Sequence, residues 1–366
     1  MELSDRFPTP FLVASLDKVE ENYRFFQEHL PRVKVYYAVK ANATEGILRR
    51  MADMGSGFDV ASEGEMALLS SLGVSGDRMI YANPTKTIRG LEKAVECGIT
   101  RFTYDAFSEV GKIADAVPGG SVLLRISVPN EKSMVDLNTK FGASTEKAIP
   151  LLKAAAEAGL DVAGLAFHVG SQSLAAAPYE QALTICRQIF DDAKAEGMEL
   201  RSLDIGGGFP APSALELPLD LSTMMDSIQE NIDRLFPDTE VCAEPGRYMC
   251  STAVNLVTSV IGVKDRGHTM WYILDEGVYG TFSGQVFDHW LFGLEWFKTG
   301  TLYPSRFAGP SCDGIDVING PLMVPELEIG DRILVQNCGS YTSASATTFN
   351  GFSLAPTYIW EELQGK

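Results

Sequence analysis

The segment VKVYYAVKAN, residues 33–42, is the stretch around which this chain is organised. A hydrophobic run ends on Lys40, and small or polar residues follow it. A lysine at the carboxyl end of a buried strand is either a surface charge on an apolar stem or an amine placed for chemistry. The segment alone leaves both interpretations open, and the rest of the chain bears on the choice.

The same unit, a short hydrophobic strand followed by an apolar-periodic helix, repeats along the first 250 residues. The helix after residues 33–42, TEGILRRMADMG, ends on a glycine, as helices often do. Eight such strands with short connections predict a parallel (β/α)8 TIM barrel, and an unbroken run of eight favours it over an open doubly wound sheet. The strands expected after the first are GFDVAS, RMIYAN, RFTYD, SVLLRISV, VAGLAFHVG, SLDIGGGF and TEVCAEPGRYM.

Polar or glycine residues stand at the carboxyl end of each predicted strand. In a TIM barrel these ends meet at one face, which carries the chemistry. We therefore expect a single site in the barrel mouth. The residues at these ends are Lys40, Asp59, Ser62, Asn83, Asp105, Arg125, His168, Ser171, Gly206 to Gly208, Glu244 and Arg247.

Beyond about residue 250 the pattern becomes β-rich, which predicts a second, all-β domain. Its strand-like runs are AVNLVTSVIGV, TMWYILDEGV and DRILVQNCGSYTSA, and the Pro/Gly-rich residues 300–325 are expected to separate them.

The composition limits the possible functions. The 366 residues are 45% hydrophobic and 21% charged, which is typical of a globular protein. The net charge of -18 argues against nucleic acid or an anionic membrane as partner and favours a small cationic substrate. The six cysteines are dispersed and form no CxxC pair, so we expect them to be reduced thiols. We expect the protein in the cytoplasm, because the sequence shows no basic leader and no long apolar run. With four histidines and no ligand cluster, we expect no metal.

Several motifs allow two interpretations. The glycines of DIGGGFP, 204–210, predict either a phosphate cradle or a tight turn. A buried Glu244 needs a positive partner. That partner is Arg247 or, if Arg247 binds phosphate, another cation such as a protonated pyridine nitrogen. His168, Cys312 and Asp313 could be packing and turn residues or functional groups.

Nine strings occur in a fixed order: YYAVKAN, GFDVAS, YANPTKT, FHVGSQ, DIGGGFP, AEPGRY, DEGVYGTF, GPSCDGID and TFNGF. Together they resemble the pyridoxal-phosphate-dependent ornithine decarboxylase family, of alanine racemase-like fold, which includes lysine, diaminopimelate and arginine decarboxylases. The resemblance implies a pyridoxal phosphate-binding barrel over residues 16–250 and a β-domain from residues 1–15 and 251–366. It also implies a homodimer with shared active sites.

The resemblance assigns roles by position. Lys40 matches the lysine that holds the cofactor as a Schiff base, His168 the histidine that stacks on its ring, and Glu244 the carboxylate paired with its pyridine nitrogen. Other residues implied near the cofactor are Asp59, Glu65 and Arg125, and the implied phosphate binders are Ser171, Gly206, Gly207, Gly208, Gly246, Arg247 and Tyr341.

Cys312 matches a residue that protonates the reaction intermediate from the partner subunit. Asp288 and Asp313, with Tyr279, match groups that bind the distal amino group of the substrate. Two further residues, Lys140 and Asp316, resemble a salt-bridge pair across the dimer. Phe287 departs from the animal enzymes, which have tyrosine there, and this puts the pocket size in doubt.

We expect an L-ornithine decarboxylase that forms putrescine and CO2. L-lysine or dual use is the close alternative, since one methylene is worth only about 1 to 3 kcal/mol in a discriminating pocket. Diaminopimelate is disfavoured because CDG stands at 312–314 in place of a CES-type string. Other basic amino acids, a racemase and a non-catalytic homologue rank lower, since Glu244 disfavours a racemase and the cofactor residues are present.

Overall fold

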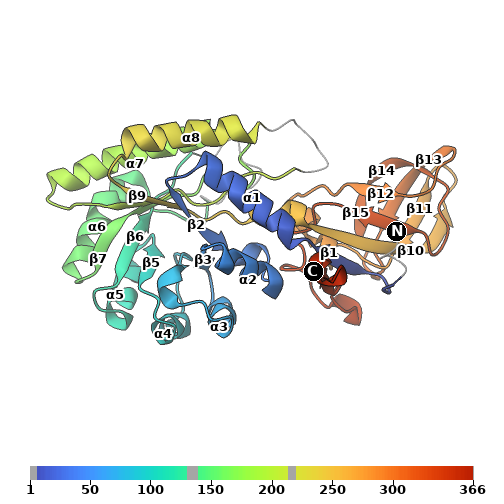
Figure 1. Ribbon diagram of the computed structural model, residues 1–366, viewed down its shortest axis with the longest axis horizontal. Coiled ribbons are helices and arrows are strands. Elements are labelled where there is room, and N and C mark those ends of the chain that lie inside the picture. The colour runs from blue at the N-terminus through green and yellow to red at the C-terminus, as the bar shows by residue number, and fades with distance from the viewer. Residues whose placement is uncertain (1–5, 130–138, 213–219, 366) are drawn as a thin grey trace. The chain divides into compact units, whose positions relative to one another are not determined.

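The computed structural model describes residues 6–129, 139–212 and 220–365. The chain divides into two compact units (Figure 1). The barrel unit comprises Glu20–Pro210 and Leu219–Gly246, and the β-unit comprises Met1–Val19, Ala211–Pro218 and Arg247–Lys366. The predicted fold class, a TIM barrel with a C-terminal all-β domain, is confirmed.

Eight parallel strands close the barrel, because β9 at the end of the series pairs with β2 at its start through Val33 and Val241. All eight strands expected from the sequence are present. They are β2 (Val33–Ala38), β3 (Gly57–Val60), β4 (Met79–Tyr81), β5 (Arg101–Tyr104), β6 (Ser121–Arg125), β7 (Asp161–Ala166), β8 (Ser202–Asp204) and β9 (Glu240–Ala243).

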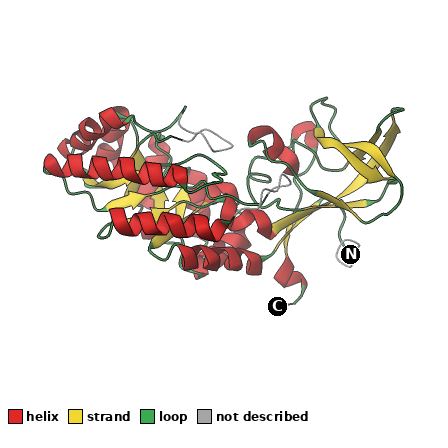
Figure 2. Ribbon diagram, turned by 90° about the horizontal axis from the view of Figure 1, so that it is seen from above, coloured by secondary structure: helices red, strands yellow, loops and turns green. Residues whose placement is uncertain are grey.

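Helices surround these strands, as Figure 2 shows in red around yellow. Helix α4 illustrates why they form. Thr87 caps it by accepting a hydrogen bond from the Gly90 backbone NH, while Leu91 and Ala94 are buried on one face. The helices are α1 (Leu16–His29), α2 (Glu45–Asp53), α3 (Glu63–Ser71), α4 (Ile88–Glu96), α5 (Phe107–Ala116), α6 (Ala148–Glu157), α7 (Ala177–Ala195) and α8 (Leu221–Leu235).

The barrel interior is filled with side chains from several strands. One apolar cluster joins Tyr36 of β2, Ile80 of β4 and Cys242 of β9, together with Ala82 just after β4. Strands β7 and β8 approach so closely that a Cβ at Gly164 would lie 1.7 Å from the Ser202 carbonyl oxygen. The barrel is therefore a packed core, and its polar residues gather at its ends.

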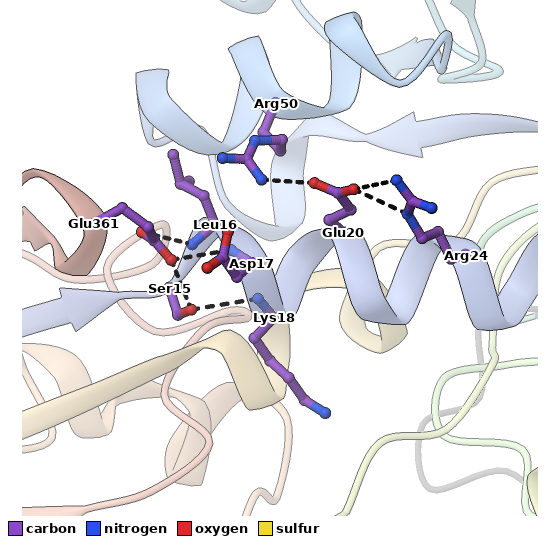
Figure 3. Close-up of polar contacts among 8 residues, drawn as sticks. All are labelled: Ser15, Leu16, Asp17, Lys18, Glu20, Arg24, Arg50 and Glu361. Atoms are coloured by element: carbon purple, nitrogen blue, oxygen red, sulfur yellow. Dashed lines mark hydrogen bonds and ion pairs between the residues drawn. The ribbon is translucent and has the colours of Figure 1, made fainter. Parts of the chain in front are cut away.

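The start of α1 is fixed within the β-unit by the carboxylate of Glu361 (Figure 3). It accepts hydrogen bonds from Ser15 Oγ at 2.9 Å and from the backbone NH groups of Leu16 and Asp17, each at 3.0 Å. Ser15 Oγ in turn accepts the Lys18 NH. A carboxylate here satisfies the otherwise unpaired NH groups at a helix N-terminus.

Within the barrel unit, Glu20 connects α1 to α2 (Figure 3). One carboxylate oxygen binds Arg24 on the same helix, and the other binds Arg50 Nη1 of α2 at 2.7 Å. The arginine charges and hydrogen bonds hold the pKa of Glu20 below its usual value.

The β-unit is built on a mainly antiparallel sheet in the order β12-β15-β10-β11-β13-β14, with β1 between β10 and β16. The expectation that residues 300–325 only separate strands is wrong, because β13 and β14 form there and pair through a register that runs from Leu302↔Pro325 to Ala308↔Val317. The strands are β1 (Phe11–Ala14), β10 (Val254–Asp265), β11 (Met270–Leu274), β12 (Leu294–Trp296), β13 (Leu302–Ala308), β14 (Val317–Pro325), β15 (Arg332–Val335) and β16 (Thr357–Ile359). Its short helices are α9 (Arg247–Cys250), α10 (Gly284–Phe287) and α11 (Trp360–Leu363).

Among the helices of the described residues, none is both long enough and apolar enough to cross a membrane.

Candidate active site

Lys40 lies just beyond β2, in a 3-10 turn over Val39–Ala41. Its Nζ forms an ion pair with Asp59 Oδ2 of the neighbouring strand β3. The Asp59 side chain is 1% exposed and that of Lys40 is 45% exposed. Asp59 Oδ1 is buried and has no hydrogen-bond partner among the described residues. The lysine amine is therefore held by a buried carboxylate at the carboxyl ends of the barrel strands.

Glu65 lies in the first turn of α3, where Ser62 Oγ accepts its backbone NH. The Glu65 carboxylate reaches back to accept the Ala61 NH at 2.6 Å, a variant of the capping box. Burial, with a contribution from the Asp59 charge, raises the pKa of Glu65, while Lys40 acts in the opposite direction. Glu65 is thus an electrostatic neighbour of the Lys40–Asp59 pair.

His168 follows β7, and its Nδ1 accepts the Gly170 NH at 3.0 Å. In a neutral ring this bond places the remaining proton on Nε2. Burial and the charges of Arg125 and Lys40 lower the pKa of His168 well below its usual value. His168 is therefore a neutral imidazole at pH 7 whose tautomer is fixed by the backbone.

The glycine loop after β8 is held tightly to its surroundings. Its Gly206 NH donates to Asp204 Oδ1 at 2.8 Å, and Tyr179 OH donates to the Gly207 carbonyl at 2.9 Å. Gly206 has φ +67°. A Cβ at Gly207 would lie 2.7 Å from the Glu244 carbonyl oxygen and 3.0 Å from His168 Nε2. Only a residue without a side chain fits here.

Glu244 follows β9, and its NH donates to the Gly206 carbonyl at 2.8 Å. Burial and the neighbouring carboxylates of Asp204 and Asp59 raise the pKa of Glu244 well above its usual value, while Lys40 and Arg125 oppose this shift. Lys40 and Glu244 are therefore close enough to interact electrostatically. A cation placed beside this enclosed acid would favour its ionised form.

Arg125 ends β6. Its Nε and Nη2 are buried without a hydrogen-bond partner among the described residues, although its guanidinium lies 5.0 Å from the Phe141 ring. Burial lowers the pKa of Arg125, and the charges of Glu244, Asp105 and Asp59 oppose that shift. Buried unsatisfied donors are rare in proteins, and these two are available to a bound acceptor group.

Asp204 is a further residue of this cluster, and the sequence did not single it out. It ends β8, is fully buried and anchors the glycine loop through Oδ1. Burial raises its pKa to about 6. The only available signal was its position two residues before the glycine run in DIGGGFP.

These groups fit pyridoxal phosphate. Four features match its chemistry: an amine beside a buried carboxylate, an enclosed acid whose ionised form a cation would stabilise, guanidinium donors without a partner among the described residues, and a glycine cradle. By contrast, no group of acidic, histidine or cysteine side chains in the described residues could hold a metal ion.

Arg247 lies in the β-unit. The sequence placed it at a strand end with Glu244, but β9 ends at Ala243 and Arg247 begins α9. Its guanidinium forms an ion pair with Asp288. The guanidinium also lies 5.0 Å from the Tyr341 ring. Two other predicted phosphate binders, Ser171 and Gly246, lie in the segments that follow β7 and β9.

Cys312 and Asp313 lie between β13 and β14. The exposed Cys312 donates its NH to Asn350 Oδ1 at 3.0 Å. Asp313 Oδ2 accepts the hydroxyl of Tyr279 at 2.5 Å, and this bond lowers the pKa of Asp313. The Tyr279 ring stacks on Phe349 with a centroid distance of 4.2 Å. Two of the residues predicted to bind substrate, Asp313 and Tyr279, are therefore in direct contact within one chain.

The two residues of the predicted intersubunit salt bridge lie in different units. Asp316 is buried in the β-unit and accepts the Val278 NH at 2.8 Å and the Ser311 NH at 3.0 Å. Lys140 lies in the barrel unit, with Nζ 4.8 Å from the Phe141 ring. Their pairing across a dimer stays a prediction.

Comparison with known proteins agrees with this geometry. Residues 16–251 match the family model for the pyridoxal-binding domain of pyridoxal-dependent decarboxylases. The lysine/ornithine decarboxylase of Selenomonas ruminantium is 61% identical over 98% of this chain and 92% of its own length. Mouse ornithine decarboxylase is 35% identical over 95% of this chain and 80% of its own length.

A crystal structure of a double mutant of the Selenomonas lysine decarboxylase in complex with pyridoxal phosphate superposes with a TM-score of 0.97. It is 61% identical and covers 99% of this chain and 94% of the other. The fold and the site define a pyridoxal phosphate-dependent carboxy-lyase that acts on amino acids. The chain belongs to the pyridoxal-dependent decarboxylase family whose members include ornithine, lysine and arginine decarboxylases.

Proposed function

We propose that this enzyme decarboxylates both L-lysine and L-ornithine, forming cadaverine and putrescine. The observation that carries the proposal is 61% identity over nearly the whole chain to a relative named for both substrates. Relatives named ornithine decarboxylase are 34–36% identical. The higher identity to the relative named for both substrates favours an enzyme that uses both lysine and ornithine over one that uses ornithine alone.

Pyridoxal phosphate supplies an electron sink for the bond to the departing carboxyl group. Lys40 would hold the cofactor covalently, and Asp59 orients the amine through their ion pair. Glu244 would keep the pyridine nitrogen protonated, because an enclosed carboxylate favours a cation beside it. The neutral ring of His168 would stack on the cofactor without repelling that charge.

The remaining assignments concern phosphate, substrate and proton transfer. Asp288 and Asp313, with Tyr279, would bind the distal ammonium of the substrate, and Cys312 would return a proton to its α-carbon. The proposed phosphate binders and cofactor neighbours are Ser171, Gly206, Gly207, Gly208, Gly246, Arg247, Tyr341, Glu65 and Arg125.

We infer that the active form is a homodimer in which Cys312 and Asp313 serve the partner's site. Large apolar side chains that are exposed in the β-unit support an interface. Ile315 is 59% exposed, Phe287 is 66% exposed and Phe349 is 38% exposed. A monomer at the concentration of the activity assay would contradict this inference.

We also place the enzyme in the cytoplasm. All six cysteines are free thiols, which suits a reducing compartment. Cell fractionation would test this assignment.

The substrate assignment is tested by measuring CO2 released when the purified protein with pyridoxal phosphate is incubated separately with lysine, ornithine, arginine and diaminopimelate. We expect lysine and ornithine to give kcat/KM values within about 100-fold of each other, since a single methylene contributes only about 1–3 kcal/mol. Preference for arginine or diaminopimelate, or a larger gap between lysine and ornithine, would refute dual use.

A further inference from the structure

Arg247 is the centre of a buried cluster within the β-unit. Its side chain is 4% exposed, and Nη2 forms an ion pair with Asp288, whose side chain is 13% exposed. Nη1 lies 3.4 Å from Ser340 Oγ, which accepts its hydrogen bond. The guanidinium lies 4.6 Å from the Trp290 ring and 5.0 Å from the Tyr341 ring. Two aromatic rings and a carboxylate therefore surround the guanidinium.

The two loops that form this cluster have unfavourable backbone conformations. His289, between Asp288 and Trp290, has φ +53°, and Tyr341 has φ +52°. Both angles lie in the left-handed region, which is unfavourable for a residue with a side chain. Such conformations persist where the surrounding structure imposes them, and they concentrate at functional sites. The loops are thus constrained to present Asp288, Trp290 and Tyr341 to one guanidinium.

The Arg247–Asp288 pair has a consequence for anion binding. The carboxylate already neutralises the guanidinium in a largely buried setting, where a charge without a partner is costly. A phosphate that approaches Arg247 brings up to two further negative charges. One guanidinium cannot compensate both anions, so the arrival of phosphate weakens the hold of Arg247 on Asp288. Asp288 then needs another cation.

We propose that Asp288 and the phosphate of the cofactor compete for Arg247, so that cofactor binding transfers Asp288 from Arg247 to the distal ammonium of the substrate. This inference rests on the roles of Arg247 and Asp288 in the proposed function. Asp288 is then a positioning residue that couples two binding events. Binding of phosphate therefore raises the affinity of the chain for a diamine, and by linkage binding of a diamine raises its affinity for phosphate.

The first experiment compares pyridoxal phosphate with pyridoxal, which lacks the phosphate, on the cofactor-stripped full chain. Dissociation constants are measured from the visible absorbance of the lysine-bound cofactor in the wild type and in Asp288→Asn. We expect the ratio of the pyridoxal constant to the pyridoxal phosphate constant to rise at least about fivefold in Asp288→Asn, the lower end of typical couplings. The reason is that the competitor for Arg247 is lost.

Asp265→Asn is the matched control. It removes the same charge from an exposed turn of the same unit, where Asp265 Oδ1 accepts the Gly267 NH and an asparagine can do the same. Its ratio should equal that of the wild type. An unchanged ratio in Asp288→Asn would refute the competition, and a lower ratio would show that Asp288 orients Arg247 for phosphate.

A second experiment needs no variant and no cofactor, so it decides the matter even if Asp288→Asn does not fold. Inorganic phosphate is titrated into the stripped wild-type chain by calorimetry, with and without saturating cadaverine. We expect cadaverine to tighten phosphate binding at least about fivefold. No phosphate binding, or no effect of cadaverine, overturns the proposal. If instead no lysine-bound cofactor forms in the first experiment, the proposed function fails while this titration still tests the ion pair.

Discussion

Asp204 ends β8, and Glu244 directly follows the neighbouring strand β9. The Asp204 carboxylate raises the pKa of Glu244, whereas a side-chain hydrogen bond with Glu244 lowers the pKa of Asp204. The same two residues hold the glycine loop from both sides. Asp204 Oδ1 accepts the Gly206 NH, and the Glu244 NH donates to the Gly206 carbonyl. The glycine loop proposed to bind phosphate and the acid proposed for the pyridine nitrogen are therefore connected both through hydrogen bonds and through their charges.

The first prediction concerns the pH dependence of stability. Burial raises the pKa of Asp204 from 3.8 to about 6. In this interval the folded chain binds more protons than the unfolded chain, so the free energy of unfolding falls as pH rises through it. Asp204→Asn removes this titration and keeps the oxygen that accepts the Gly206 NH. In the cofactor-free chain, the free energy of unfolding of the variant should rise relative to that of the wild type as the pH increases. The increase should reach up to about 3 kcal/mol between about pH 4 and about pH 7.

Urea unfolding at several pH values measures this difference. If the difference in free energy of unfolding between variant and wild type does not change with pH, Asp204 has the same pKa in the folded and unfolded chains, which contradicts the prediction.

The second prediction concerns the Lys40–Asp59 pair. Lys40→Met should lower the stability of the cofactor-free chain, because it leaves the 1% exposed Asp59 side chain without its cation. We expect the free energy of unfolding to fall by about 1–3 kcal/mol. This is less than the ~3–5 kcal/mol lost when one partner of a fully buried ion pair is removed, because Lys40 is 45% exposed. The double variant Lys40→Met with Asp59→Asn should recover most of it, as measured by denaturant unfolding. If the losses of the two single variants simply add, the pair contributes no coupling.

Lys40→Met should also abolish the visible absorbance of the bound cofactor. A variant that keeps this band after free cofactor has been removed would exclude Lys40 as the attachment point.

The third prediction tests the charge at position 244. Glu244→Gln should lower kcat by about 100- to 1000-fold, the loss typical of removing one preorganised electrostatic group. The control is Glu240→Gln at the start of β9, the strand that Glu244 follows, where Glu240 pairs with Arg101. That variant should keep nearly full activity. Steady-state CO2 release measures both, and equal losses in the two variants would count against the assignment of Glu244.

The fourth prediction compares two glycines. Gly207→Ala should destabilise the chain and weaken binding of pyridoxal phosphate, because the new Cβ would lie 2.7 Å from the Glu244 carbonyl oxygen. Gly111→Ala places the same methyl group on α5 with no atom within 4 Å. It should stabilise the chain by about 0.5–1 kcal/mol through helix propensity. Thermal unfolding and cofactor titration check both, and equal effects of the two variants would contradict the close packing at Gly207.

Sequence periodicity was sufficient for the barrel, because each strand repeats the same local signal of hydrophobic run, short polar loop and amphipathic helix. It was insufficient for β13 and β14. Prolines and glycines in residues 300–325 indicated an irregular segment, but the pairing of Leu302 with Pro325 and of Ala308 with Val317 turns this segment into a hairpin. Tertiary pairing outweighed local propensity there.

The sequence by itself determined which chemistry-bearing residues stand at the strand ends, since a βα repeat brings the carboxyl ends of all its strands to one face. Only the tertiary structure decided which groups meet. It joined Lys40 to Asp59, added Asp204 to the neighbourhood of Glu244, and paired Arg247 with Asp288, 41 positions further along the chain. The physical reason is that contact and burial, which set charge pairing and pKa, depend on distances in space that residue spacing does not encode.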